Sequence, residues 1–141
     1  MGTGYLLDTN VVSEARKRNG NPLVREWIAA THGPVLHLSG LTVGEIRRGV
    51  ELRRRRDPAQ AAVLERWLSE LLRQFGDRIA PITPEVAEEW GRLNAVRPIP
   101  TADGLIAATA RVNGWTLVTR NVKDFEGTGV SLVDPFDLPP A

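Results

Sequence analysis

Short apolar runs alternate with longer amphipathic stretches along the whole chain of 141 residues. Runs of a few apolar residues are typical of buried parallel strands, whereas stretches with apolar positions three and four residues apart are typical of helices. Breaks rich in glycine, proline and asparagine separate the two kinds of segment. The pattern predicts strands at residues 5–7, 35–39, 78–82, 115–119 and 130–133.

The clearest helical stretch follows Asp57, which has the position of a helix cap ahead of Pro58. Six apolar residues in this stretch have the spacing of one buried helix face: Leu64, Trp67, Leu68, Leu71, Leu72 and Phe75. Other helices are expected from about Asp8 to Lys17, from Pro22 to Thr31, from Thr42 into residues 53–56, from Pro84 onward, and from Ala102 to Asn113. The spacing of Thr42 and Glu45 predicts a capping box, and Thr101 is the expected cap of the last helix.

The alternation of strands and helices predicts the fold class. Strands connected through helices usually form a parallel sheet with helices on both faces. We therefore expect an α/β protein, a three-layer α/β/α sandwich with a central parallel sheet. The length fits one domain over residues 1–141, with its core at about 4–135 and a proline-rich tail from residue 134.

The amino-acid composition excludes several classes of protein but does not identify one. A formal net charge of +1 does not fit a general polycation, and the absence of cysteine excludes disulfides and thiolate metal sites. The chain holds no apolar run long enough for a signal peptide or a membrane span. A cytoplasmic location and no membrane partner are the resulting expectations.

Four acidic residues far apart in the chain fall where a predicted strand ends or a predicted helix begins: Asp8, Glu45, Asp103 and Asp124. Taken alone, each could be an ordinary helix cap or turn residue. In a parallel α/β fold, however, these positions meet at one edge of the sheet. A cluster of carboxylates repels itself unless a cation lies between them, and oxygen ligands suit Mg²⁺ or Mn²⁺. The four acids therefore indicate a metal-dependent enzyme that acts on a phosphate ester.

Four segments of the chain, in order, resemble the signature segments of PIN-domain ribonucleases. They are Leu6–Asn10, Thr42–Ile46, Thr101–Ala110 and Leu117–Phe125. Within that family the chain is most similar to the VapC and FitB-like toxins of bacterial type II toxin–antitoxin pairs. The resemblance covers residues 5 to about 135 and implies a PIN-like fold.

The resemblance also implies roles for particular residues. Asp8, Glu45 and Asp103 match the family's core metal-binding acids, and Asp124 matches a fourth, more variable acid. Thr119 matches a hydroxyl residue near the catalytic water, and Asn121 is a weaker match to a pocket residue. The implied activity is Mg²⁺- or Mn²⁺-dependent hydrolysis of RNA by an endoribonuclease. No histidine has the spacing of a zinc site.

The implied partners are an RNA substrate and a cognate antitoxin that places a basic side chain in the acidic pocket. A toxin homodimer is also implied, and two dimers could assemble on operator DNA through the antitoxin. An alternative function is a catalytically weak binding module whose acidic pocket mainly receives an antitoxin arginine. A receiver-type phosphotransfer domain is disfavoured, because only one acid follows the first strand.

Two groups of arginines leave their role open: Arg47 with Arg48, and the run from Arg53 to Arg56. They could form a solvated helix end, where cations suit the negative end of the helix dipole. They could instead contact RNA phosphates or the acidic residues of a partner protein. Four successive arginines point around the whole helix, so they cannot all face one ligand. The four tryptophans are expected in the core or in an interface.

Overall fold

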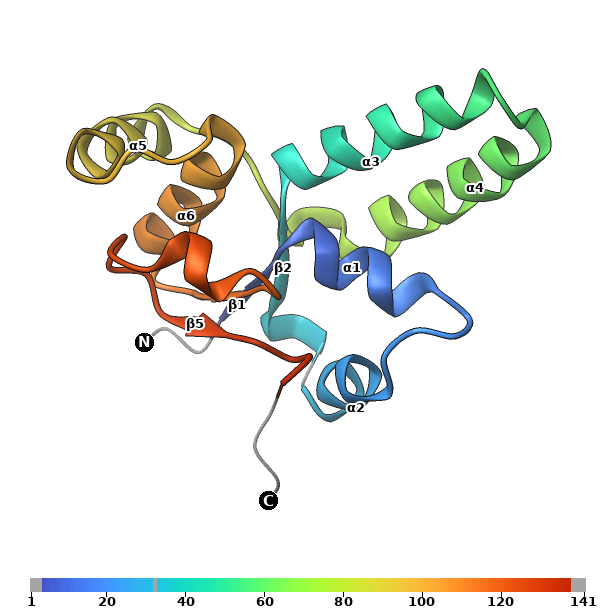
Figure 1. The fold of residues 1–141 in the computed structure, drawn as a ribbon, viewed down its shortest axis with the longest axis horizontal. Coiled ribbons are helices and arrows are strands. Elements are labelled where there is room, and N and C mark those ends of the chain that lie inside the picture. Colours follow the sequence, from blue (N-terminus) through green and yellow to red (C-terminus); the bar gives the residue numbers. More distant parts are fainter. Residues whose placement is uncertain (1–3, 32, 138–141) are drawn as a thin grey trace.

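The computed structural model describes residues 4–31 and 33–137 and has a central five-stranded sheet, shown in Figure 1. All neighbouring strands are parallel, in the order β3-β2-β1-β4-β5. The strands are β1 (Tyr5–Leu7), β2 (Leu36–Ser39), β3 (Ile79–Ala80), β4 (Thr116–Val118) and β5 (Leu132–Val133). The predicted parallel sheet is confirmed, although several strands are shorter than expected.

Six α-helices cover the two faces of the sheet in the described part of the chain. They are α1 (Thr9–Arg16), α2 (Pro22–Ala30), α3 (Gly40–Arg54), α4 (Pro58–Phe75), α5 (Pro84–Val96) and α6 (Thr101–Asn113). Three short 3-10 helices are η1 (Gly33–Val35), η2 (Gly76–Arg78) and η3 (Val122–Phe125). Helices α1 to α4 lie on one side of the sheet and α5 with α6 on the other (Figure 1). This is the predicted three-layer α/β/α sandwich.

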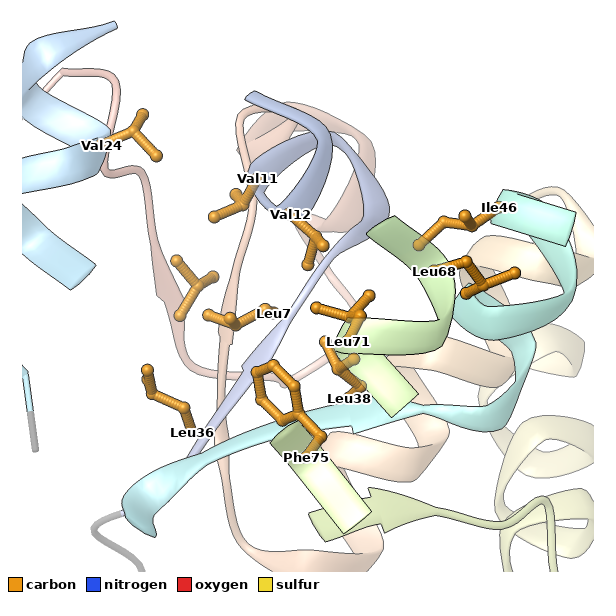
Figure 2. Packing of buried hydrophobic residues seen from close by; sticks show 11 residues of the cluster. Leu7, Val11, Val12, Val24, Leu36, Leu38, Ile46, Leu68, Leu71 and Phe75 are labelled. Atoms are coloured by element: carbon orange, nitrogen blue, oxygen red, sulfur yellow. The ribbon is translucent and has the colours of Figure 1, made fainter. Parts of the chain in front are cut away.

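The larger apolar core lies between the sheet and the layer of α1 to α4, as Figure 2 shows. Leu7 of β1 and Leu38 of β2 are almost fully buried there against Leu68, Leu71 and Phe75 of α4. The predicted stripe on α4 is therefore confirmed for these three residues. Leu72 is the exception, because 38% of its surface is exposed.

The second core lies between the sheet and the pair α5–α6. Leu6 and Leu117 of the sheet pack there with Leu93 of α5 and Ile106 of α6. Small residues on α6, including Ala107 and Ala110, allow this helix to lie close to the strands. The alternation of Leu6 and Leu7 between the two cores follows from the two-residue period of a strand.

A glycine in α6 permits the close contact between α5 and α6. A Cβ atom on Gly104 would lie 2.7 Å from Cδ1 and 2.8 Å from Nε1 of Trp90. Overpacking of this kind costs about 1–3 kcal/mol, so Gly104→Ala should lower the melting temperature by roughly 3–10 °C. Gly91→Ala is the control, because a Cβ at this exposed position of α5 meets no atom within 4 Å. Equal melting temperatures for the two variants would contradict the prediction.

Two predicted helix starts are wrong in detail. Helix α3 begins at Gly40, and its cap is Ser39, whose Oγ accepts a hydrogen bond of 3.0 Å from the Leu41 N–H. Thr42 is not a cap; it lies fully buried within the first turn, because β2 continues into α3 without a loop. Helix α6 is preceded by Pro100, and Thr101 is its first residue. The predicted loop 121–129 contains η3.

None of the helices in residues 4–31 and 33–137 combines the length and the hydropathy that crossing a membrane requires.

Candidate active site

The carboxyl ends of β1 and β4 meet at Asp8, the residue that follows β1. Asp8 caps α1, and its Oδ1 accepts a hydrogen bond of 2.8 Å from the Thr9 N–H. Its own N–H donates to the carbonyl oxygen of Val118 at 2.9 Å, which extends the pairing of the two strands. Only 6% of Asp8 is exposed. The sheet and the helix therefore fix this carboxylate together.

Thr119 holds the second oxygen of the same carboxylate. It follows β4, is fully buried, and its hydroxyl donates a hydrogen bond of 2.8 Å to Oδ2 of Asp8. Oγ1 of Thr119 accepts in turn from the Asn121 N–H at 3.1 Å. The structure therefore gives Thr119 a direct role in orienting Asp8, whereas a role next to the catalytic water stays a prediction.

Asn10 completes the network around Asp8, a role that the sequence did not reveal. Its Nδ2 lies 3.5 Å from Oδ2 of Asp8 and 3.4 Å from Oγ1 of Thr119. Its Oδ1 accepts from the Arg120 N–H at 3.3 Å. The signals in the sequence were the place of Asn10 in the signature segment Leu6–Asn10 and its position two residues after Asp8.

Glu45 reaches the same region from α3. Its side chain is exposed, and its Oε1 accepts a hydrogen bond of 2.5 Å from the hydroxyl of Thr9. Oγ1 of Thr9 also lies 3.2 Å from Oγ1 of the buried Thr42. Thr9 therefore connects Glu45 to the first turn of α1, directly beside Asp8.

Asp103 and Asp124 complete the acidic group. Asp103 lies half-buried in the first turn of α6, and Asp124 lies exposed in η3. Burial raises the pKa of Asp103, and the negative charges of Asp124 and Glu45 raise it further. This occurs although a helix N-terminus favours a carboxylate. Asp124 is therefore close enough to act on Asp103 through its charge.

The pKa of Asp8 is raised in the same way, mainly because the carboxyl is buried. Hydrogen bonds from Thr119 and from the Thr9 N–H oppose the rise, while the charges of Asp103 and Glu45 add to it. The four acids named from the sequence thus interact electrostatically at one edge of the sheet. These interactions between charges, together with the hydrogen bonds around Asp8, are the support for the prediction that the four acids meet at one edge of the sheet.

The raised pKa of Asp103 predicts how stability depends on pH. A carboxyl that binds its proton more tightly in the folded state makes the free energy of unfolding fall as pH rises from the ordinary value of 3.8 through the folded-state pKa. Asp103→Asn should therefore raise the melting temperature at pH 7–8 in EDTA, and the gain should shrink toward about pH 4. Asp77→Asn, which removes a charge in η2, is the control. A gain that is independent of pH would contradict this account.

The donors at this edge fit a hard divalent cation in their chemistry, since all four acids offer oxygen. In the part of the chain that the structure describes, no three acidic or histidine side chains lie close enough to hold an ion as they stand. Burial is the main cause of the raised pKa values of Asp8 and Asp103, and repulsion between the carboxylates adds to it. A bound cation would relieve that repulsion. The group therefore fits a divalent cation in the chemistry of its donors, whereas its side chains do not form a closed metal site in the described part of the chain.

Curated relatives match the chain over nearly its full length. It is 34% identical to a plasmid stability protein, StbB, of Pseudomonas syringae pv. tomato, over 94% of this chain and 98% of that protein. It is 33% identical to a VapC ribonuclease of Sinorhizobium fredii, over 94% and 97% of the two chains. The FitB toxin of Neisseria gonorrhoeae is 32% identical over 93% and 97%.

Solved structures show the same similarity in three dimensions. The FitAcB structure from Neisseria gonorrhoeae matches with a TM-score of 0.89 at 33% identity, over 95% of this chain and 99% of that one. A toxin–antitoxin complex from Klebsiella pneumoniae matches with a TM-score of 0.74 at 26% identity, over 96% and 100%. The sequence model of the PIN-domain family matches residues 5–129 of this chain. With these similarities in sequence and in fold, the chain belongs to the PIN-domain family, in its group of VapC and FitB toxins.

Proposed function

We propose that the protein is the toxin of a toxin–antitoxin pair and that it hydrolyses RNA phosphodiester bonds as a Mg²⁺- or Mn²⁺-dependent endoribonuclease. The observation that carries the proposal is the buried carboxylate of Asp8, held by Thr119 and the Thr9 N–H at the edge of the sheet. Glu45 is joined to the same place through the Thr9 hydroxyl. The similarity to a protein named as a VapC ribonuclease supports the reaction.

The residues divide into ligands and the groups that orient them. Asp8, Glu45 and Asp103 are the proposed metal ligands, with Asp124 as the fourth acid. Thr119 and the Thr9 N–H hold both oxygens of Asp8, so this carboxylate loses little freedom when it binds an ion. Glu45 is less constrained, because among the described residues its side chain accepts a hydrogen bond only from the Thr9 hydroxyl.

A divalent cation held by these acids would supply positive charge and Lewis acidity at the scissile phosphate. The acids alone repel an RNA backbone, so neutralising them also permits the substrate to approach. The half-buried position of Asp103 and the buried position of Asp8 keep bulk water away from part of the pocket, which strengthens its electrostatic interactions.

A cognate antitoxin is the proposed protein partner. The similarity to FitB, named as a toxin, and to the toxin–antitoxin complex from Klebsiella pneumoniae supports this assignment. The antitoxin would place a basic side chain among the four acids, where its charge would replace that of the metal. A toxin homodimer, assembled on operator DNA through the antitoxin, is the proposed larger complex.

The decisive experiment is cleavage of total cellular RNA by purified, antitoxin-free protein with Mg²⁺, with Mn²⁺ and with EDTA. We expect discrete products that need the metal, and sequencing of their ends would identify the target RNA. Folded protein that cleaves nothing with any metal would overturn the nuclease. The acidic pocket would then be assigned to a binding module that receives an arginine of the antitoxin.

A further inference from the structure

Helix α3 has two differently organised sides, and the arginines are divided between them. On one side, Arg47 pairs with Glu51 at 3.1 Å and with Glu65 of α4 at 3.6 Å. Arg54 pairs with the same two glutamates. These two arginines belong to an ion-pair network between α3 and α4. They are occupied by structural contacts within the chain.

The other arginines of this region have no such contacts. Arg48, Arg53, Arg55 and Arg56 are exposed, and no acidic side chain of the described residues forms an ion pair with any of them. We call these four residues the arginine face. Each of the two arginine groups in the sequence contains paired and unpaired members, so the sequence alone could not separate them.

The helical repeat places three members of the arginine face on the same side of α3 as Glu45. At about 100° per residue, Arg48, Arg53 and Arg55 lie within roughly 80° of the direction of Glu45, and Arg56 follows them in the turn after the helix. Arg47 and Arg54 lie at roughly 180–200° from it. Arg55 still has helical backbone angles, φ −69° and ψ −27°, so the repeat holds to this point. The unpaired charges therefore continue the side of the helix that carries a proposed metal ligand.

Helix α3 leads away from the acidic edge of the sheet. It starts where β2 ends, close to the start of α1, and projects outward with α4 (Figure 1). About 15 Å along the helix axis separates Glu45 from Arg55, a length that several nucleotides of a single strand span. Arg48 lies in the middle of α3, so the helix dipole at the C-terminus does not explain its charge.

We propose that the arginine face binds the phosphates of the RNA strand beside the cleavage site and guides that strand to Glu45 and Asp8. This inference rests on the proposed function and adds the surface that holds the substrate. The net charge of the chain is only +1, so a local group of four unpaired cations is a distinct feature of its surface. A flexible polyanion that must end at an acidic, metal-holding pocket needs such a counterpart along its path.

The test compares two double variants on the same helix. Arg48→Gln/Arg55→Gln removes charge from the arginine face, and Arg47→Gln/Arg54→Gln removes the same charge from the opposite side. Each variant is made in an Asp8→Asn background, and its affinity for a labelled 20-nucleotide polyuridine RNA is measured with Mg²⁺ between 50 and 300 mM salt. Circular dichroism and melting temperature establish that both variants are folded.

We expect the first variant to bind about 10-fold more weakly near 0.1 M salt, with a salt dependence lower by about 1.4 in the logarithmic slope. The second variant should bind like its parent. Equal losses in both variants, or no loss in the first, would overturn the proposal. So would unchanged RNA binding with a lost antitoxin complex or an altered oligomeric state. If Asp8-containing protein binds RNA through this face but does not cleave it, the proposed nuclease fails, whereas RNA binding by the arginine face stands.

Discussion

Replacing Asp8 with asparagine is expected to lower the rate of RNA cleavage by about three orders of magnitude while the protein stays folded. The carboxylate is the proposed ligand held most firmly, with one oxygen bound by the Thr9 N–H and the other by Thr119. Asparagine keeps the oxygen that caps α1 but loses the negative charge and one acceptor. The measurement is the initial cleavage rate of the RNA identified above, at saturating Mg²⁺ or Mn²⁺.

The control for Asp8→Asn must separate a lost ligand from a damaged fold. Asp77→Asn removes an acid from η2 and should leave the cleavage rate unchanged. The far-ultraviolet circular dichroism of Asp8→Asn should match that of the parent, since the cap of α1 is retained. Substantial cleavage by folded Asp8→Asn protein would remove Asp8 from the reaction and with it the assignment of this site.

Adding Mn²⁺ to metal-free protein is expected to raise its melting temperature. A ligand that binds only the folded state adds about 2.7 kcal/mol to the free energy of unfolding at one hundred times its dissociation constant. For a chain of this size that corresponds to roughly 8 °C. The readout needs no substrate, so it tests the metal site apart from the nuclease activity.

The specificity of that stabilisation comes from variants and from pH. Asp8→Asn and Asp103→Asn should each lose most of the Mn²⁺ effect, and Asp77→Asn should keep it. The stabilisation by Mn²⁺ should also weaken in acid. Because the pKa values of Asp8 and Asp103 are raised, protons compete with the metal at a higher pH than they would at ordinary carboxyls. Equal stabilisation of all these variants would show that the ion binds elsewhere.

Much of the fold and the candidate site could be predicted from the sequence, because local signals were strong. Apolar runs end at Asp8 and near Thr119, and parallel strands bring such ends together whatever the details of packing. The start of α3 could not be predicted reliably. Ser39 and Thr42 are both good cap residues, and only the register of β2 against its neighbours decides which of them leaves the sheet.

The contacts between side chains could not be predicted from the sequence, for a different reason. The hydrogen bond between Thr9 and Glu45 joins residues 36 positions apart and depends on how α3 packs against α1. The division of the arginines depends on which side of α3 faces Glu65 of α4. Both are facts of tertiary packing, which periodicity along one segment does not contain.

Strand β2 continues directly into α3 at Gly40, so the helix hairpin α3–α4 is attached to the sheet at one end of α3. Glu45 lies about 8 Å from the fixed end at Gly40, and Arg54 lies about 21 Å from it. If the helix tilts about that junction, Glu45 moves only about a third as far as the tip. A displacement of the outer end by such a tilt would therefore move Glu45 relative to Asp8 by only about a third of that distance.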